Sequence, residues 1–160
     1  MSGTDPRISD KFDGPFAEFI NGLLQPGAPL APKGIHALGI RPDLWLNSID
    51  PGKVTYIWPN NGSRDISDGR AFGGWIAALS DHVVSICMFS ALTPDEHFTT
   101  QDLQIKFFRP LGHGDITIRA EVKNKSRSTG YVEAEWFNSD GKLATKVLAW
   151  KAIRPKSELQ

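Results

Sequence analysis

The sequence predicts an α+β fold in which a curled antiparallel sheet is wrapped around one long central helix. Three observations lead to this prediction. The stretch from Phe72 to Leu92 is almost entirely apolar or small and contains no proline. The segments after it alternate apolar and polar residues with the period of a β-strand. Two short strand patterns also precede the apolar stretch, so strands flank the helix on both sides.

The composition indicates one compact domain without a charged partner. The chain has 160 residues, 40% of them hydrophobic, which suits a single domain with a real core. Its 18 basic and 18 acidic residues balance, so no net charge attracts nucleic acid or an anionic membrane. The single Cys87 cannot form an internal disulfide, which is typical of a reducing cytoplasm. The first residues lack the pattern of a signal peptide, and we expect a cytoplasmic protein.

The N-terminal part is predicted to be one short helix followed by a connector. Five apolar residues lie at helical spacing between residues 15 and 25, namely Phe16, Phe19, Ile20, Leu23 and Leu24. Residues 26–34 contain three prolines and two glycines, a composition typical of an irregular segment. We therefore divide the chain into an N-terminal helix and connector, residues 1–34, and a main domain, residues 35–160.

The strands are predicted on both sides of the long helix. Residues 44–49 and 54–58 form strand patterns around the turn Asp50-Pro51-Gly52, and residues 60–69 are polar enough to be a loop. Four more strand patterns cover residues 103–107, 116–122, 132–136 and 142–153. The short breaks between them favour a four-stranded antiparallel meander. A sheet that covers a helix buried on several sides must curl around it, which is the hotdog architecture.

Asp81 is the first candidate for chemistry. It is the only carboxylate between Asp68 and Asp95, and it lies in the middle of the helix that we expect to be buried. Burial of an unpaired carboxylate costs several kcal/mol or raises its pKa. Asp81 therefore has either a functional or a structural role. In the structural case it lies on a solvated stripe of the helix or caps a neighbouring backbone group. His82 points about 100° away from it on a helix, so we expect a partly exposed or core-edge histidine rather than a facing partner.

Gly73 and Gly74 stand at the predicted start of the same helix. The first helical N–H groups have no intrahelical acceptor, and glycine lets a substrate carbonyl approach them closely. Such donors can hold an oxyanion, although a tight turn would also explain the pair. Gly73 and Asp81 are eight residues apart, or roughly 12 Å along a helix. If both act on one carbonyl, the donor must come from a second subunit, which predicts a homodimer with two equivalent sites.

The run from Phe72 to Asp81 resembles the His-Gly-Gly…Leu-x-Asp signature of hotdog acyl-CoA thioesterases of the phenylacetate-degradation (PaaI-like) type. The segment from Asp102 to Pro110 is similar to the strand of that family that ends in Arg-Pro. The resemblance covers about residues 54–153. It implies hydrolysis of a small or aromatic acyl thioester, with coenzyme A as part of the substrate, no other cofactor, and a dimer or a dimer of dimers.

The resemblance also implies roles for particular residues. Asp81 would be general base or nucleophile, the Gly73 N–H the oxyanion donor, and Gly74 a support for the turn. Thr100 falls where relatives carry a hydroxyl that positions water, although it also suits a plain strand start. We expect the loop 125–130 to bind the phosphates of coenzyme A, unless it is only a solvated turn. The candidate substrate-binding residues are Phe72, Trp75, Phe108, Arg109, Lys125, Arg127 and Ser128.

Two positions depart from the family pattern. Phe72 replaces the motif histidine. Ile66 falls at a position where many relatives have a polar residue. Neighbouring Asp65 or Ser67 could take that place only if the loop shifts its register. These changes leave a non-catalytic acyl-CoA or lipid-binding protein as an alternative. An acyl carrier protein conjugate is a second possible substrate. A hydratase is the third reading, and it would need Asp81 to pair with His36, His97 or His113.

Overall fold

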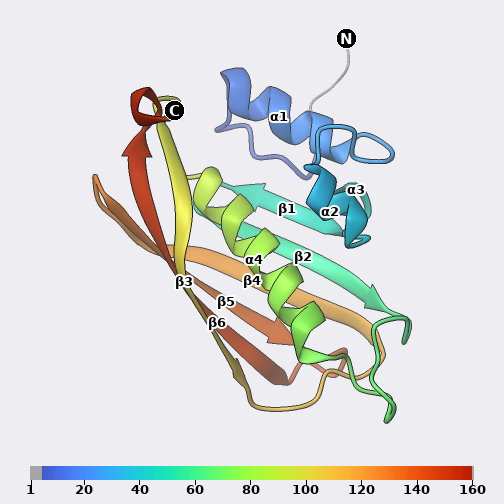
Figure 1. Cartoon of the computed structure of the whole chain (residues 1–160). Helices are drawn as coiled ribbons and strands as arrows, with labels where there is room; N and C mark the ends of the chain where they lie inside the picture. Colours follow the sequence, from blue (N-terminus) through green and yellow to red (C-terminus); the bar gives the residue numbers. More distant parts are fainter. Residues whose placement is uncertain (1–4, 160) are drawn as a thin grey trace.

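The computed structural model describes residues 5–159 as one six-stranded antiparallel sheet with a long helix across its concave face (Figure 1). The strand order in the sheet is β1-β2-β4-β5-β6-β3. The helices are α1 (Gly14–Leu24), α2 (Lys33–Ala37), α3 (Pro42–Trp45) and α4 (Gly73–Phe89), followed near the end of the chain by a short 3-10 helix (Lys156–Glu158). The strands are β1 (Leu46–Asp50), β2 (Lys53–Asn60), β3 (Glu96–Phe107), β4 (Gly114–Lys125), β5 (Thr129–Phe137) and β6 (Leu143–Pro155).

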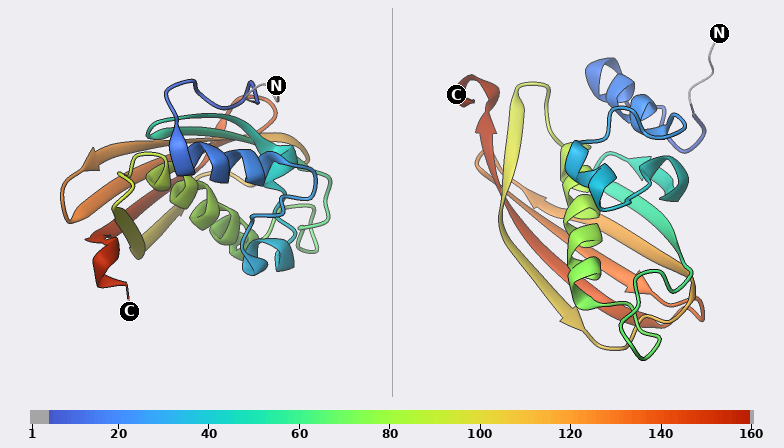
Figure 2. Two further views of the ribbon diagram at one scale, coloured as in Figure 1. Left: turned by 90° about the horizontal axis from the view of Figure 1, so that it is seen from above. Right: turned by 45° about the vertical axis from the view of Figure 1, so that its right-hand side comes forward.

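The expected α+β hotdog fold is confirmed. The sheet curls around α4, and the second view in Figure 2 shows the helix lying along the hollow of the sheet. Ten residues of α4 are buried, among them Leu79, Val83 and Cys87 on successive turns. These apolar side chains pack against inward-facing residues of the strands, such as Ile118 and Trp136, in one hydrophobic core. Burial of apolar surface on both sides of this contact stabilises the arrangement.

The predicted four-stranded meander is wrong at one point. β3 pairs along its length with β6, from Glu96 opposite Pro155 to Phe107 opposite Thr145, and not with β4. β4 pairs instead with β2. The reason is the path of the chain: α4 crosses the hollow of the sheet and delivers β3 to the far edge. The next connection then returns across the end of the sheet. Short connections alone do not determine which strands are neighbours.

The N-terminal segment packs onto the end of α4. Phe16 and Phe19 of α1 contact Phe89, with ring centroids 5.0 and 5.2 Å apart. Ile20 and Leu23 of the same helix are buried in the common core. The short helices α2 and α3 were not expected, and α3 contains Leu44 and Trp45, which were predicted as the start of a strand. Pro32 and Pro42 stand at their starts, where proline is tolerated because the first helical N–H groups have no acceptor.

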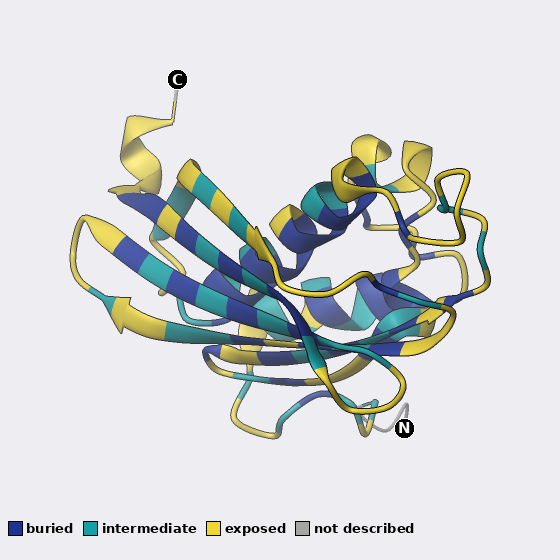
Figure 3. Cartoon of the chain, turned by 90° about the horizontal axis from the view of Figure 1, so that it is seen from below, coloured by how far each residue is buried: buried dark blue, intermediate teal, exposed yellow. Residues whose placement is uncertain are grey.

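One side of the molecule is open. β3 is the last strand of the sheet, and all 12 of its residues are exposed or half-buried (Figure 3). Gly73, Gly74 and Asp81 of α4 are exposed as well. A long unpaired strand edge offers N–H and C=O groups to a further strand. Within residues 5–159, none of the helices has both the length and the apolar character needed to cross a lipid bilayer.

Candidate functional site

Asp81 lies on the open side of α4 and not in the core. Its side chain is 52% exposed in the single chain, which corrects the expectation of a carboxylate buried in the middle of the helix. The residues that share this side of α4 are small, including Gly74, Ala77, Ala78 and Ser85. They form a shallow stripe with Asp81 as its one charged residue, so the carboxylate is accessible to a molecule that lies along the helix.

Thr100 and Lys151 are the polar partners of Asp81. The Thr100 hydroxyl donates to Asp81 Oδ1 at 3.3 Å. Lys151 Nζ lies 3.7 Å from the same carboxylate oxygen. It also donates to Thr100 Oγ1 at 2.7 Å and to Ser85 Oγ at 3.1 Å. The cluster therefore joins α4, β3 and β6, and it gives the carboxylate one hydroxyl donor and one cation.

The sequence reasoning missed Lys151. Its side chain is 0% exposed, and this burial lowers the pKa of Lys151 while the Asp81 carboxylate opposes the shift. The sequence did contain a signal. Val147, Ala149 and Ile153 lie on the same face of β6 as Lys151, and all three are buried. A lysine at an inward position of a buried strand face needs polar partners.

The start of α4 offers free backbone donors. Its N-cap residue is Phe72, and no side chain caps the helix there. The N–H groups of Gly73 and Gly74 come first in the helix and have no acceptor within it. Gly74 leaves room for the Phe72 ring, because a Cβ at that position would lie 2.5 Å from Phe72 Cε2. The absence of a side chain at Gly74 thus allows the N-cap phenylalanine.

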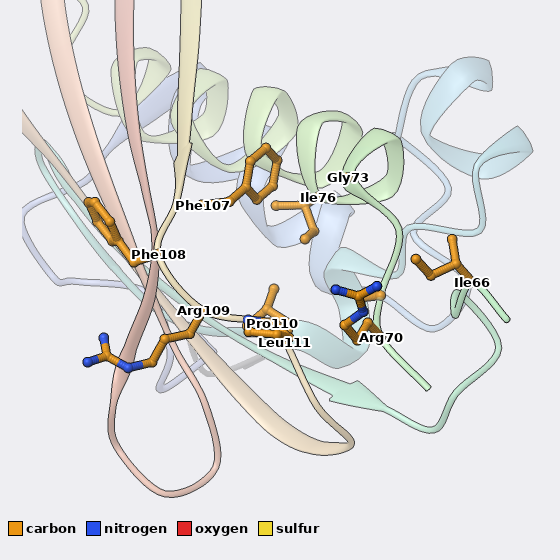
Figure 4. Close-up of a pocket in the computed structure, with 10 residues that line it drawn as sticks. Ile66, Arg70, Gly73, Ile76, Phe107, Phe108, Arg109, Pro110 and Leu111 are labelled. Atoms are coloured by element: carbon orange, nitrogen blue, oxygen red, sulfur yellow. The ribbon is translucent and has the colours of Figure 1, made fainter. Parts of the chain in front are cut away.

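A cavity of about 400 Å³ opens beside this helix start. Figure 4 shows Phe107 pointing toward Gly73 and Ile76, with Arg70 and Leu111 across the cavity. The cavity is lined by Ile66, Arg70, Ala71, Gly73, Ile76, Phe107, Phe108, Arg109, Pro110 and Leu111.

The predicted substrate-binding residues near the helix start occupy different places in the structure. Phe108 and Arg109 line the cavity. Arg109 is tied by its guanidinium to the backbone carbonyl of Leu143 at 2.7 Å. Phe72 is 42% exposed but is not part of the lining. Trp75 is a core residue rather than a pocket residue.

Trp75 is buried within a cluster of tryptophans. Its ring lies 6.2 Å from that of Trp45 and 5.7 Å from that of Trp58. The guanidinium of Arg64 covers its face at 4.2 Å. The sequence could not separate these roles, because a large aromatic residue in the first helical turn suits either a core or a pocket.

The basic loop after β4 lies at the other end of α4. Gly130 packs against Met88, near the helix C-terminus. Lys125 is engaged by Glu96 at 2.9 Å, while Arg127 is exposed. The side chain of Ser128 is also exposed, and its carbonyl accepts from the N–H of Ile153. The 17 residues of α4 span about 25 Å, so one chain does not bring this loop together with Gly73.

The loop before α4 does not shift in a way that would bring Asp65 to the position of Ile66. Asp65 is bonded to His113 Nε2 at 2.5 Å, so its carboxylate does not take the place of the polar residue that Ile66 replaces. Ile66 itself lines the cavity. The cavity mouth is therefore more apolar here than the family pattern implies.

His82, the neighbour of Asp81 in the sequence, is a core residue. His82 is buried deeper than expected, with 7% exposure, and its Nε2 lies 2.9 Å from the Tyr56 hydroxyl. Burial lowers the pKa of His82 to about 4. Among the described residues no histidine bonds to Asp81, so the pairing that a hydratase would need is not formed. In the same part of the chain, no group of three or more His, Cys, Asp and Glu residues is arranged to hold a metal ion.

Comparison with known proteins gives consistent matches. Residues 68–145 match the model of the thioesterase superfamily. A protein of Saccharolobus solfataricus named as a putative esterase is 38% identical over 117 residues, which cover 71% of this chain and 81% of that protein.

Solved structures share the fold. One is a phenylacetic acid degradation-related protein of Ralstonia eutropha, with a TM-score of 0.69 and 22% identity over 84% of this chain and 98% of that one. Another is the PaaI protein of the Escherichia coli phenylacetic acid degradation operon, with a TM-score of 0.65 and 20% identity over 76% of this chain and 83% of that one.

Proposed function

Since the chain belongs to the thioesterase superfamily, we propose that it hydrolyses the thioester bond of a small or aromatic acyl-CoA, with Asp81 as general base or nucleophile. The observation that carries this proposal is the position of Asp81. It is an accessible carboxylate on a stripe of small residues, held at one oxygen by Thr100 and Lys151. A carboxylate that is fixed at one oxygen and open at the other can act on a water molecule or on a carbonyl carbon.

In the general-base route, Asp81 takes a proton from water while the water oxygen attacks the thioester carbonyl. The carbonyl oxygen becomes an oxyanion, which then collapses as the carbon–sulfur bond breaks. The products are a carboxylic acid and a thiol, and the proton held by Asp81 passes to the departing sulfur. In the nucleophilic route, Asp81 attacks the carbonyl itself and the carbon–sulfur bond breaks, so that the thiolate leaves. Water then hydrolyses the resulting anhydride, which restores the Asp81 carboxylate, releases the carboxylic acid and supplies the proton that the thiolate takes up. Both routes need the same carboxylate in the same place.

The oxyanion needs donors that Asp81's own helix cannot bring to it. The free N–H of Gly73 suits the role, but it stands eight residues before Asp81 on α4, or about 12 Å away. The exposed side of α4 and the free edge of β3 leave room for a second subunit that brings such a donor. A second copy that lies against α4 and the free edge of β3 would supply its Gly73 to this Asp81 and receive the reciprocal contact. We therefore propose a homodimer with two shared sites, which two dimers can extend to a tetramer.

The surroundings of the site support an acyl-CoA substrate. The cavity beside Gly73 has an aromatic and aliphatic lining, with Phe107 and Leu111 among its residues, and suits a short or aryl acyl group. Arg127 and Ser128 on the exposed loop suit the phosphates of coenzyme A. Lys125 adds positive charge there, although Glu96 neutralises part of it. Such a substrate and the lone Cys87 fit a cytoplasmic protein.

The test is thiol release from a panel of short-chain, long-chain and aryl acyl-CoAs, with wild type compared with Asp81→Asn. We expect wild type to turn over at least one substrate and the variant to lose about 100-fold or more of that rate while it stays folded. The matched control is Asp115→Asn, because Asp115 is an exposed aspartate at the start of β4. Full activity of Asp81→Asn would overturn the proposal.

One observation favours a second function. Phe72 stands at the N-cap of α4 in place of the motif histidine, and its side chain cannot form a hydrogen bond. If wild type binds acyl-CoA in a calorimeter but releases no thiol from any substrate of the panel, the protein is a non-catalytic acyl-CoA or lipid-binding hotdog protein. A Phe72→His variant that gains turnover would identify the residue responsible.

A further inference from the structure

Lys151 is a buried cation that the proposed reaction does not by itself require. Its side chain is 0% exposed, and it projects from β6 into the space between α4 and β3. A lone ammonium in such a place is unfavourable, because burial removes its hydration. A buried lysine that reaches the candidate carboxylate therefore requires an explanation in terms of that carboxylate.

We propose that Lys151 is a positioning residue, which acts through Thr100 to fix the orientation of the Asp81 carboxylate. This inference rests on the function proposed above and deepens it. Lys151 does not touch the substrate, because no part of its side chain reaches the surface. Its effect is confined to the groups that it contacts.

The hydrogen bonds determine the direction of the Thr100 hydroxyl. An ammonium group has only donors, so Thr100 Oγ1 must accept from Lys151 at 2.7 Å. The Thr100 proton is then left to point toward Asp81 Oδ1 at 3.3 Å. Without Lys151 the same hydroxyl could turn and accept from water or from the backbone. The lysine thus turns a threonine with two possible roles into a donor to the carboxylate.

The same arrangement leaves one carboxylate oxygen for the reaction. Thr100 and Lys151 both approach Asp81 on Oδ1, and within the described chain no hydrogen bond is made to Oδ2. One oxygen of the carboxylate is anchored, while the side chain as a whole stays 52% exposed on the open side of α4. A base or a nucleophile gains from such a fixed orientation, because small displacements reduce its rate strongly.

The charges around Lys151 are few. From α4 the ammonium contacts the Asp81 carboxylate and the Ser85 hydroxyl, while Cys87 of the same helix is buried in the core. Burial raises the pKa of Cys87 to about 12, so the thiol is neutral at ordinary pH. From β3 it faces Thr100 and the ring of Phe98, whose centroid lies 5.1 Å from Nζ. Among the described residues, Asp81 is the one carboxylate within ion-pair distance of the ammonium.

The test compares Lys151→Met with Lys146→Met. Methionine fills a similar volume without a charge, and Lys146 is a half-exposed lysine of the same strand that pairs with Glu133. We expect Lys151→Met to fold, because replacing a buried charge by an apolar side chain is often neutral for stability. Its kcat should fall about 10- to 100-fold with little change in KM. Lys146→Met should match wild type in kcat and KM.

Chemical rescue separates positioning from packing. Lys151→Ala leaves a space into which a small primary amine fits, so added propylamine should restore part of kcat. Propanol at the same concentration should not, because it carries no positive charge. If propanol restores activity as well as propylamine does, Lys151 serves only to fill space and the proposal is wrong.

A measurement without turnover keeps this inference distinct from the proposed function. The three-bond ¹³C couplings that report the χ1 rotamer of Asp81, measured by NMR without substrate, should show one rotamer in wild type and Lys146→Met and an average over rotamers in Lys151→Met. If wild type shows no turnover but this difference is present, the proposed function fails while the coupling of Lys151 to Asp81 stands. If wild type turns over substrate and Lys151→Met has the same kcat and the same Asp81 rotamer, the positioning role is refuted and the proposed function stands.

Discussion

The hydroxyl of Thr100 donates to the carboxylate of Asp81 at 3.3 Å, and this contact joins the central helix to the free edge of the sheet. The strand that carries Thr100 is therefore the strand at which we propose that a second copy docks. A partner that pairs with β3 would lie directly beside the carboxylate. Assembly and catalysis would use the same surface.

Removing the Thr100 hydroxyl should affect activity and stability together. In Thr100→Val the carboxylate loses a donor, and Lys151 loses its acceptor at 2.7 Å. We expect kcat/KM to fall about tenfold and the free energy of unfolding to fall by about 1–2 kcal/mol, because a buried charged donor is left with one partner fewer. Thiol-release kinetics and urea denaturation measure the two effects. Thr100→Ser keeps the hydroxyl and should stay close to wild type; equal losses in both variants would argue against this role.

The backbone donor of Gly73 can be removed without removing the helix. Proline has no N–H, and it suits the first helical position after a residue with extended backbone, which Phe72 is. Gly73→Pro should therefore lower kcat about 100- to 1000-fold, the usual effect of losing an oxyanion donor. Gly73→Ala keeps the N–H, and its Cβ would lie at an ordinary 3.4 Å from the Phe107 ring. Similar kcat values for the two variants would exclude an oxyanion role for this N–H.

The exposed Arg127 should contribute to the binding of coenzyme A and not to the chemical step. We expect Arg127→Ala to raise KM for an acyl-CoA about tenfold with kcat unchanged, because a phosphate loses a charged donor. The KM of a short acyl-pantetheine thioester, which lacks the nucleotide, should not change. Lys123→Ala is the matched control, because Lys123 is an exposed cation of the same hairpin that pairs with Glu121 at 2.7 Å. An equal rise of KM for both substrates would contradict the assignment.

Acid should destabilise the fold through His82. Its pKa is lowered by burial to about 4 in the folded chain, while an unfolded histidine titrates near 6.5. As the pH falls from about 6.5 to 4, the unfolded state binds a proton that the folded state does not, so the folded state loses stability. The loss reaches about 3 kcal/mol at the lower end.

The difference in unfolding free energy between wild type and His82→Gln isolates this effect, since glutamine does not titrate. Wild type should lose more stability than the variant between pH 7 and pH 4.5 in urea denaturation. If both lose the same amount, the buried histidine is not the acid-sensitive group.

Local patterns predicted most elements but not their arrangement. The helix from Gly73 to Phe89 follows from the length of its apolar run, and the later strands follow from their alternating apolar residues. The neighbour of β3 could not be predicted, because pairing with β6 depends on where α4 delivers the chain. The short helices α2 and α3 were missed, because proline and glycine also occur at helix starts and their segments are too short for a clear period.

The candidate site was predictable where single residues stand out. Asp81 is conspicuous as a lone carboxylate in an apolar run, but its exposure depends on the small residues beside it and on what covers that side of α4. Lys151 was overlooked because the strand pattern of β6 was read for its apolar members only. Trp75 lies in the core and Phe108 at the cavity. This difference depends on tertiary packing and could not be predicted from the aromatic character of the two residues.

The central claim is that one active site takes Asp81 from one subunit and the Gly73 N–H from the other. Mixing two inactive variants, Asp81→Asn and Gly73→Pro, under conditions that exchange subunits tests it most directly. A mixed dimer contains one site in which both residues are intact, and half of the dimers are mixed. Thiol release should therefore recover to about a quarter of the wild-type rate. If subunit exchange is complete and no activity returns, the two residues do not act on the same carbonyl and the shared-site account is wrong.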